Sequence, residues 1–336
     1  MKILLSSYAF HPSLGGIESA SELLASEFAR LGHEVRVLTH SAGADKPEWP
    51  FEVFRNPGAR ALVELVRWCD VFFHNNISLS AAWPLLLVRR PWVIAHQTWI
   101  ARLDRSQNWQ DHLKRFLLRF ATNVSISGAV ERDIAIPSER IPNPYRDAVF
   151  QQLPGVERSR ELVFLGRLVS DKGCDLLLDA LQRLKGEGVV AGLTIIGAGP
   201  EEAGLRSQAQ ALGVEAQVRF AGPKTGAELA GLLNEHRVLV VPSLWAEPFG
   251  IVALEGIACG CVVVGSQEGG LPDAIGACGL TFPNGDAVAL AAALRKVLTQ
   301  EGLLDQLRSG APEHLAKHTA RSVAAAYLAI FERHLS

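Results

Sequence analysis

The stretch that decides the fold is ELVFLGRLVSDKGCDLLLDALQRLKGEGVVAGLTIIGAG, residues 161–199. It opens with an apolar run, 161–166, that predicts a buried strand, and continues over 175–185 with apolar residues at helical spacing. A second strand is expected at 193–196. Strand, helix and strand in this order predict a parallel βαβ unit with helices covering the sheet.

The same alternation runs through the rest of the chain. Strands are expected at 2–10, 34–40, 52–55, 71–74, 92–96 and 123–127, with a helix at 17–31, and again at 218–221, 238–242 and 262–265. A turn-rich patch at Pro154-Gly155 is interpreted as the linker between two units. The sequence therefore predicts an α/β fold with two consecutive domains, 1–153 and 154–317.

Length and composition agree with this division. The chain has 336 residues, 48% hydrophobic and 20% charged, with a formal net charge of −2. At roughly 100–200 residues per domain this favours two cores, and it excludes a disordered chain. A near-neutral balance argues against nucleic acid as a partner. The opening run is interrupted by Ser6 and Ser7, so we expect no signal peptide and a cytoplasmic protein.

The charge is concentrated in one segment. Residues 89–119 contain seven Lys/Arg and two Asp/Glu, a local +5, with Trp92, Trp99 and Trp109 among them. This pattern favours a solvated helix face with tryptophans in the core. The alternative, peripheral contact with an anionic membrane at its inner face or with an acidic acceptor, stays open.

Two glycine-containing turns invite a phosphate interpretation. Gly197-x-Gly199 follows an expected strand, but the third glycine of a dinucleotide fingerprint comes late and two glutamates stand where pyrophosphate would approach. We therefore interpret it as a tight β-to-α turn. Gly15 and Gly16, between Ser13-Leu14 and Ile17-Glu18, are better placed to offer backbone amides to an oxyanion at a helix N-terminus.

The second half adds two cations. Arg167 follows the strand 161–166, and Lys172 lies just before the next helix. The carboxyl ends of strands in open α/β sheets are where ligands bind. Arg grips phosphate oxygens as a bidentate fork, and Lys acts as a mobile point charge. These residues predict a diphosphate site, although spacing alone also allows a surface cluster.

The most informative motif is Glu247-Pro-Phe-Gly-Ile-Val-Ala-Leu-Glu255. Eight positions are a little over two helical turns, so both carboxylates face one side if both are helical. Pro248 suits a first helical turn. Glu247 is then expected exposed at the helix entrance. Glu255 lies deeper among apolar residues, where it needs polar partners such as ribose hydroxyls.

Together these motifs resemble the retaining glycosyltransferases of the GT-B fold, family four. The resemblance spans nearly the whole chain and rests on the following motifs: Gly15-Gly16, Ile141-Pro-Asn-Pro, Gly166-Arg167, Asp171-Lys172-Gly173, Ile196-Gly197-x-Gly199, Phe220-x-Gly222, Pro242-Ser243, the Glu247/Glu255 pair and Gly269-Gly270-Leu-Pro. It implies two Rossmann-like domains facing a central cleft. It also implies that the last helix, about 318–336, packs back onto the first domain.

The resemblance implies a nucleotide-sugar donor held by the second domain. The resemblance implies that Arg167 and Lys172 bind the diphosphate, helped by the amides of Gly15 and Gly16. It implies that Glu255 binds the ribose and Glu247 contacts the transferred sugar. Phe249, Gly250 and Ile251 are implied to contact the donor at the helix start.

The first domain is implied to hold the acceptor. His96 resembles the family's active-site histidine, but Gln97 follows it where many relatives have Asp. A packed strand-end histidine is the alternative for His96. Ser127 matches a position on the acceptor side, while its sequence context alone predicts a helix cap. The chain lacks an Asp-x-Asp motif, so we expect no metal and no other cofactor.

The expected function is transfer of a sugar, with retained configuration, from a nucleotide-diphosphate sugar to a hydroxyl of a saccharide, a lipid-linked acceptor or a small molecule. UDP carrying glucose, galactose or N-acetylglucosamine is the first choice, and GDP-mannose the next. A nucleotide-sugar epimerase or a phosphorylase on the same fold is the alternative, and a silent sugar-nucleotide binding protein is the third. The acceptor, the linkage and the oligomeric state are left open.

Overall fold

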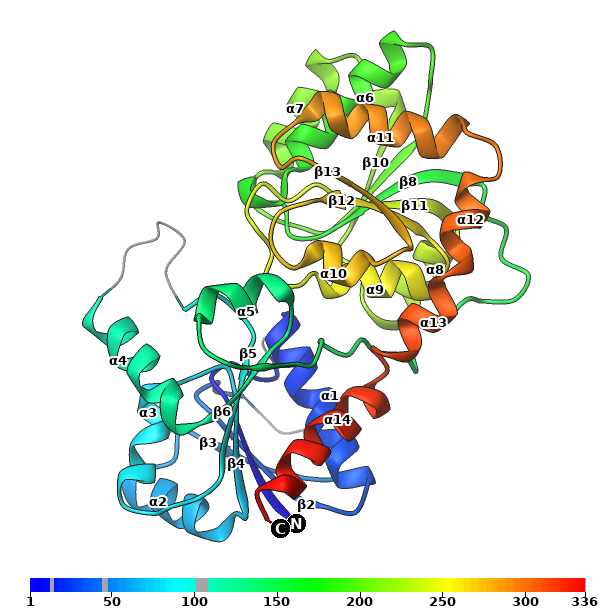
Figure 1. Ribbon diagram of the computed structural model, residues 1–336. Helices are drawn as coiled ribbons and strands as arrows, with labels where there is room; N and C mark the ends of the chain where they lie inside the picture. Colours follow the sequence, from blue (N-terminus) through cyan, green and yellow to red (C-terminus); the bar gives the residue numbers. More distant parts are fainter. Residues whose placement is uncertain (13–14, 44–47, 101–107, 336) are drawn as a thin grey trace. The chain divides into compact units, whose positions relative to one another are not determined.

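The computed structural model describes residues 1–12, 15–43, 48–100 and 108–335 (Figure 1). Ser13 and Leu14 of the glycine turn lie outside these residues, as do Arg102 and Arg105 of the basic segment. The chain divides into two compact units. The first combines Met1–Tyr145 with His318–Ser336, and the second is Arg146–Lys317.

Within its described residues, the first unit is built on a parallel sheet of seven strands in the order β3-β2-β1-β4-β5-β6-β7. The strands are β1 (Lys2–Ser7), β2 (Glu34–Thr39), β3 (Glu52–Arg55), β4 (Val71–Asn75), β5 (Trp92–His96), β6 (Thr122–Ser125) and β7 (Glu139–Arg140). The helices are α1 (Gly16–Arg30), α2 (Ala59–Trp68), α3 (Leu79–Ala82), η1 (Trp83–Leu86), α4 (Trp109–Leu117), η2 (Leu118–Phe120), α5 (Gly128–Ile134) and α14 (Ala320–Arg333).

The second unit has a parallel sheet of six strands in the order β10-β9-β8-β11-β12-β13, over described residues throughout. The strands are β8 (Arg160–Leu165), β9 (Leu193–Ile196), β10 (Val218–Gly222), β11 (His236–Val241), β12 (Val262–Ser266) and β13 (Gly279–Phe282). The helices are η3 (Ser170–Lys172), α6 (Cys174–Gly186), α7 (Glu202–Ala211), η4 (Glu215–Gln217), α8 (Gly226–Asn234), α9 (Ile251–Ala258), α10 (Leu271–Ile275), α11 (Ala287–Thr299), α12 (Leu303–Ser309) and α13 (Ala311–Ala316).

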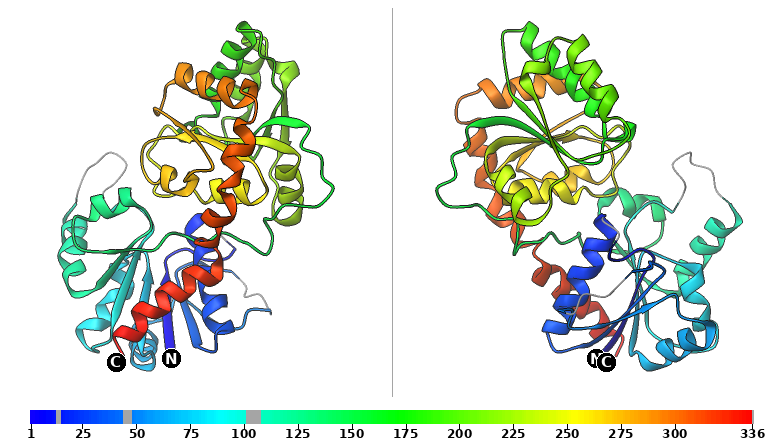
Figure 2. Two further views of the ribbon diagram at one scale, coloured as in Figure 1. Left: turned by 45° about the vertical axis from the view of Figure 1, so that its right-hand side comes forward. Right: turned by 180° about the vertical axis from the view of Figure 1, so that it is seen from behind.

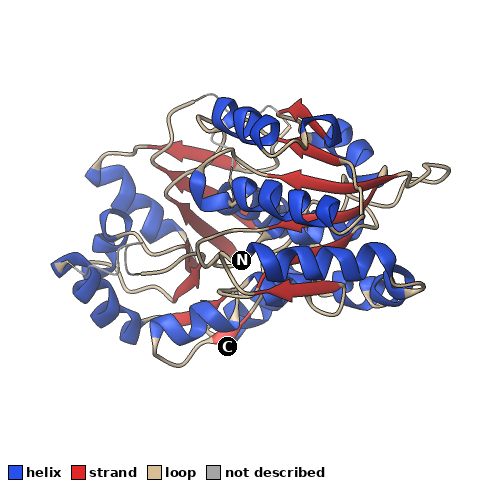
Figure 3. Ribbon diagram, turned by 90° about the horizontal axis from the view of Figure 1, so that it is seen from above, coloured by secondary structure: helices blue, strands red, loops and turns tan. Residues whose placement is uncertain are grey.

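Both sheets confirm the predicted α/β class and its Rossmann-like order, in which the chain starts in the middle of the sheet and reverses direction once. All residues of β4, β5, β9 and β12 are buried, as expected of parallel strands that run between helices (Figure 3). None of the helices in the described ranges is long and apolar enough to cross a membrane.

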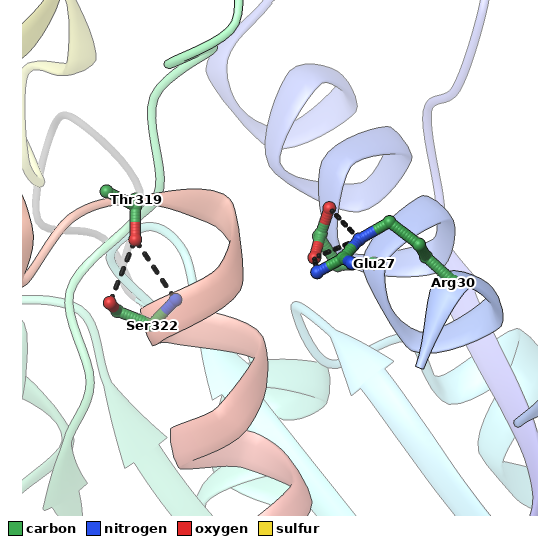
Figure 4. A network of polar contacts seen from close by, with 4 residues as sticks. All are labelled: Glu27, Arg30, Thr319 and Ser322. Carbon is green, nitrogen blue, oxygen red and sulfur yellow. Dashed lines mark hydrogen bonds and ion pairs between the residues drawn. The ribbon is translucent and has the colours of Figure 1, made fainter. Parts of the chain in front are cut away.

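The last helix, α14, belongs to the first unit and packs along α1 (Figure 2). Its Phe331 is fully buried, with ring centroids 5.6 Å from Phe28 of α1 and 5.4 Å from Phe73 of β4. Figure 4 shows how the helix begins: the Oγ1 of Thr319 accepts a hydrogen bond from the amide of Ser322 at 3.1 Å. This side-chain cap satisfies one of the free amides of the first turn.

Phe331→Ala is expected to destabilise the first unit by about 3–5 kcal/mol, because it leaves a cavity in the core that α14 completes. Denaturant unfolding followed by near-ultraviolet circular dichroism measures this loss. Phe120→Ala is the matched control, since that ring is 68% exposed. Equal unfolding midpoints for the two variants would show that α14 contributes nothing to the core.

The boundary between the units differs from the sequence prediction. The first unit ends at Tyr145, ahead of the predicted limit at 153. The reason is Asn234, a fully buried side chain of α8. Its Oδ1 accepts from the amide of Leu153 at 2.9 Å and its Nδ2 donates to the carbonyl of Gln151 at 3.0 Å. The turn at Pro154-Gly155 therefore lies inside the second unit, and its glycine and proline gave no sign of this long-range anchor.

The two points where the chain leaves and re-enters the first unit are hydrogen-bonded to each other. The amide of Tyr145 donates to the carbonyl of His318 at 3.1 Å. The His318 ring, 4% exposed, lies with its Nδ1 3.3 Å from the carbonyl of Asn143. The segment 141–145, which its prolines exclude from a helix, thus runs beside the start of the C-terminal segment.

The Gly197-x-Gly199 turn is explained by packing. A Cβ on Gly197 would collide with the carbonyl of Gly166, and one on Gly199 with the carbonyl of Leu168. The amide of Leu168 donates to the carbonyl of Ala198 at 3.0 Å. These glycines let two loops at the carboxyl ends of β8 and β9 approach each other, as a tight β-to-α turn requires.

Candidate functional site

The candidate site of the second unit lies where the strand order reverses, between β8 and β11. Loops that follow the strands at such a point diverge and leave room for a ligand. The chain continues after β8 through Gly166 and Arg167 into η3, and after β11 through the loop 242–250 into α9. These two connections carry the predicted cations and the first predicted carboxylate.

The two connections are joined by backbone contacts. The amide of Leu244 donates to the carbonyl of Asp171 at 2.9 Å. Gly173 has φ +66°, and a Cβ there would strike the carbonyl of Pro242. A residue with a side chain would therefore be both strained and obstructed at this position. The contact fixes the residue before it, Lys172, against the loop after β11.

Lys172 and Glu247 form the central ion pair. Lys172 Nζ lies 2.5 Å from Glu247 Oε1, and the Ser243 hydroxyl donates to the same oxygen at 2.8 Å. The side chains are 20% and 14% exposed. The Glu247 backbone is held as well, because its carbonyl accepts from the amide of Gly270 at 2.7 Å. Within the described chain Glu247 Oε2 has no hydrogen-bond partner, so it can accept one from a ligand hydroxyl.

Two expectations for Glu247 are wrong. The residue does not begin a helix: α9 starts at Ile251, after Gly250 in the left-handed region at φ 99°. Pro248 therefore lies in the loop and not in a first helical turn. The carboxylate is also largely buried instead of exposed, because Lys172 and Ser243 cover it. The glycine of the motif redirects the chain just before the helix, which the eight-residue spacing of the two glutamates does not reveal.

Glu255 lies in the second turn of α9. Burial raises the pKa of its carboxyl to about 7, and the positive charge of Arg146 works against this rise. The described residues offer its carboxylate no hydrogen-bond donor. A desolvated carboxyl without a donor is costly when ionised, and a ligand that brings hydroxyl groups would relieve that cost.

The structure also places the other residues that were predicted to bind the nucleotide-sugar donor. Arg167 is exposed, and its guanidinium forms no hydrogen bond or ion pair with any described residue. Phe249 is 2% exposed, so only its backbone could reach a ligand. Gly250 and Ile251 stand at the N-terminus of α9, where amides without helical partners are available.

Sequence reasoning missed the residue that clamps this region. Asn284 donates through Nδ2 to the carbonyls of Ser243 (3.0 Å) and Leu244 (3.4 Å), and its Oδ1 accepts from the amide of Glu268 at 3.0 Å. One side chain thus ties the loop after β11 to the loop after β12. In the sequence it sits in Pro283-Asn-Gly, which reads as an ordinary turn.

In the first unit, Gly15 and Gly16 open α1 as predicted. Gly15 is the N-cap in an extended conformation, with φ −177°, and Gly16 is the first helical residue. The Glu18 carboxylate lies close beside Gly15, where it would collide with a Cβ. A carboxylate in the first turn already complements the helix dipole. An anionic ligand that approaches these amides therefore has to displace the Glu18 side chain.

His96, at the end of β5, has a protonation state fixed by its neighbour. Asn123 donates through Nδ2 to the carbonyls of Leu118 (2.9 Å) and Ala121 (3.0 Å), so its Oδ1 can only accept. His96 Nε2, 3.0 Å from that oxygen, must therefore carry the proton. Burial lowers the pKa of the ring to about 4, which keeps it neutral near pH 7. Its Nδ1 is then a buried acceptor without a partner among the described residues.

Gln97 presents a second acceptor of this kind. Its Nε2 donates to Asn75 Oδ1 at 2.8 Å, and Asn75 Nδ2 donates to Ser21 Oγ at 2.6 Å. Gln97 is 4% exposed, and its Oε1 is buried with no described partner. His96 and Gln97 thus leave two lone-pair acceptors unused at the carboxyl end of one strand. Such atoms call for hydroxyl or amide donors.

A pocket of about 440 Å³ lies at the carboxyl ends of β1 and β4. Tyr8, Ile17, Asn75, Asn76, Gln110 and Lys114 are among its lining residues. It mixes an apolar wall with amide groups and one cation, and through Asn75 it adjoins the network that holds Gln97.

Ser127 is the N-cap of α5. Its Oγ accepts from the amide of Val130 at 3.2 Å, and the residue is fully buried. This confirms the helix-cap interpretation. A contact with the acceptor stays a prediction.

Curated relatives match about half of the chain. The D-inositol 3-phosphate glycosyltransferase of Corynebacterium jeikeium is 35% identical over 184 residues, which are 52% of this chain and 44% of that protein. The glycogen synthase of Mycobacterium tuberculosis is 36% identical over 176 residues, 50% of this chain and 42% of that protein. The chain thus spans less than half the length of these relatives.

Solved structures match over the whole chain. Anabaena HepE, crystallised with UDP, has a TM-score of 0.84 at 21% identity and covers 99% of this chain and 100% of its own. A glycosyltransferase of Rickettsia africae ESF-5 has a TM-score of 0.83 at 15% identity and covers 100% and 98%. This likeness confirms the predicted GT-B fold. Residues 146–314, the second unit almost entirely, match the family described as glycosyl transferases group 1. The chain belongs to the glycosyl transferases group 1 family.

Proposed function

We propose that this protein transfers a sugar from a nucleotide-diphosphate sugar to a hydroxyl acceptor, with retention of anomeric configuration and without a metal ion. The observation that carries the proposal is the Lys172–Glu247 ion pair at the switch point of the second unit, together with Glu255 in the second turn of α9. A UDP-sugar is the first choice of donor, because HepE was crystallised with UDP.

The diphosphate falls to Arg167 and Lys172. One N–H of the Lys172 ammonium points at Glu247, which leaves two for phosphate oxygens. Arg167, exposed and without a described partner, keeps all its donors for the ligand. Fixed positive charge beside the bond that breaks lowers the barrier, since negative charge grows on the leaving diphosphate in the transition state.

The two carboxylates take different parts of the donor. Glu247 Oε2 accepts from a hydroxyl of the transferred sugar, while Oε1 stays with Lys172 and Ser243. Glu255 accepts from the ribose hydroxyls, which supply the donors that its desolvated carboxyl lacks. The amides of Phe249, Gly250 and Ile251 add contacts at the start of α9.

The reaction forms one bond and breaks one on the same face of the sugar. The anomeric carbon loses its bond to the diphosphate oxygen and gains a bond to the acceptor oxygen. The acceptor proton passes to the departing phosphate oxygen. We assign the acceptor to the first unit, where His96 Nδ1 and Gln97 Oε1 are buried acceptors for its hydroxyls. Ser127 and the pocket lined by Tyr8 and Asn75 are assigned to the acceptor as well.

The test begins with thermal shift against a panel of UDP-, GDP- and ADP-sugars, because binding raises apparent stability by mass action. The donor found in this way is then incubated with acceptor pools. Release of nucleoside diphosphate only when acceptor is present supports transfer, and proton NMR of the product gives its anomeric configuration. Activity that survives chelation supports metal independence. Formation of an epimer without acceptor would overturn the proposal.

Glu255 gives a pH prediction. Its carboxyl pKa is about 7 in the free protein, and ribose hydroxyls bind the ionised form better. Binding therefore releases a proton, and affinity for the nucleoside diphosphate is expected to rise by up to about tenfold per pH unit below pH 7 and to level off above it. The folding stability of the ligand-free protein changes with pH in the opposite direction. Between 4.5 and about 7 the folded state keeps a proton that the unfolded chain has lost, so stability falls as pH rises.

Calorimetry with the nucleoside diphosphate at several pH values checks this dependence. Glu255→Gln is the control, because it removes the titrating group and leaves the phosphate's own ionisation unchanged. Glu255→Ala is expected to weaken nucleotide binding at every pH. A folded Glu255→Ala variant with unchanged affinity would contradict the ribose role.

A further inference from the structure

Helix α4 and the η2 turn after it carry an apolar row on their outer side. Trp109, Leu113, Phe116 and Phe120 follow one another at spacings of four, three and four residues, so they lie along one helix face. They are 70%, 37%, 52% and 68% exposed. We call these four residues the aromatic stripe. Core packing predicted from the sequence is therefore correct for Trp92, which is 8% exposed, and wrong for Trp109.

The opposite face of α4, which packs on its own unit, is polar. Asp111 is 4% exposed and forms a capping box with Asn108 at the helix start. Arg115 donates to the carbonyl of Asp133 at 2.7 Å and approaches its carboxylate at 3.5 Å. These contacts fix the rotation of the helix about its axis. These polar contacts hold the aromatic stripe toward solvent. An ordinary surface helix instead turns its apolar face to the core and its polar face to solvent.

Positive charge accompanies the stripe. Arg119, between Phe116 and Phe120 in sequence, is exposed and forms no ion pair with a described residue. Residues 108–120 contain three Lys/Arg and one Asp/Glu, a net +2. The preceding connection, between β4 and β5, lies on the same face of the sheet, because parallel crossovers share one hand. It adds Leu86 and Leu87, 83% and 68% exposed, and the exposed Arg89.

We propose that the aromatic stripe docks this protein on the surface of an anionic lipid bilayer. Trp and Phe at the water–lipid interface beside Arg are the composition of interfacial helices. The cations match anionic headgroups, while the aromatic rings enter the boundary of the acyl region. A docking surface for a neutral protein partner would not need this excess of positive charge. The inference stands apart from the proposed transfer reaction.

The contact is expected to be reversible. α4 has nine residues, and one short apolar element supplies about as much membrane affinity as a single weak anchor. Attraction between arginines and headgroups is screened by salt. Binding should therefore be strong on anionic vesicles at low ionic strength and fall steeply as salt is added.

The full chain is tested by co-sedimentation with vesicles of phosphatidylcholine alone, and of phosphatidylcholine and phosphatidylglycerol in equal parts. We expect binding to the mixed vesicles and about tenfold or more weaker binding for Phe116→Ser/Phe120→Ser. Val190→Ser/Val288→Ser is the matched control, because these apolar side chains are 68% and 60% exposed in the second unit. Arg119→Glu should weaken binding several-fold more than Arg321→Glu, an equal charge change at an exposed site on α14.

Trp109→Phe locates the contact. This variant keeps an aromatic ring, so it should still bind, and it should lose most of the blue shift in tryptophan emission that the wild type shows on vesicles. Circular dichroism confirms that each variant is folded. Absence of wild-type binding to anionic vesicles, or equal losses in the stripe and control variants, overturns the proposal. A concentration-dependent dimer that Phe116→Ser/Phe120→Ser abolishes overturns it as well, because the stripe is then covered by a second copy.

Discussion

Lys172→Met is expected to reduce turnover by about 10²–10³-fold and to weaken binding of the nucleoside diphosphate. Two losses combine in this variant. In the proposed site the diphosphate loses a cation that faces it, and Glu247 keeps a mostly buried charge with no cation beside it, since its side chain is only 14% exposed. Steady-state kinetics with the identified donor and calorimetry with the nucleoside diphosphate measure the two effects separately.

The control for Lys172→Met is Lys296→Met, which removes an exposed lysine from α11 of the same unit. It should leave both measurements unchanged. Lys172→Arg keeps the charge but not the compact ammonium, so it should recover diphosphate binding better than turnover. A folded Lys172→Met variant with wild-type diphosphate affinity would remove this residue from the donor site.

Glu247→Gln is expected to lower turnover by about 10²–10³-fold while diphosphate affinity stays nearly the same or rises. The amide still accepts from Ser243, so the loop should keep its shape. The neutral amide does not form the ion pair with Lys172 that the carboxylate forms, so the lysine is free to bind the phosphates. What is lost is the carboxylate that we propose interacts with the reacting sugar.

Glu313→Gln is the matched control, because the Glu313 side chain is 85% exposed on α13. Equal losses of turnover and affinity in Glu247→Gln would contradict the division between sugar and diphosphate. The double variant with Lys172→Met adds a further test. Because the two side chains form one ion pair, its loss of turnover should be smaller than the product of the two single losses.

Local sequence was sufficient for much of the fold. The strands Trp92–His96 and Leu193–Ile196 begin and end where the apolar runs predict, because buried parallel strands are continuous apolar segments. Features that depend on distant residues were not predictable. The unit boundary follows from Asn234, some eighty positions from the segment that it anchors. The rotation of α4 depends on Asp133 and Asn108, whereas helical spacing shows only that an apolar face exists.

In the candidate site, too, local sequence predicts some features, and others depend on distant residues. Its charged residues could be named from their types and their place after strands, but their partners could not. The pairing of Lys172 with Glu247 joins loops 75 positions apart. The lone pair on His96 Nδ1 depends on Asn123, whose own orientation is fixed by two carbonyls. A linear pattern identifies which groups can titrate or donate, and the fold determines which of them are still free.

The hydrogen bond between Tyr145 and His318 makes the second unit a cassette inserted into the first. Both covalent junctions lie at a single anchored point of the host, so the ends of the insert are already close together. Residues 146–317 could be exchanged for the equivalent segment of a relative without rebuilding the host core, in which α14 packs on α1. Under the proposed function, donor and acceptor preferences could then be recombined by transplanting one continuous stretch of chain.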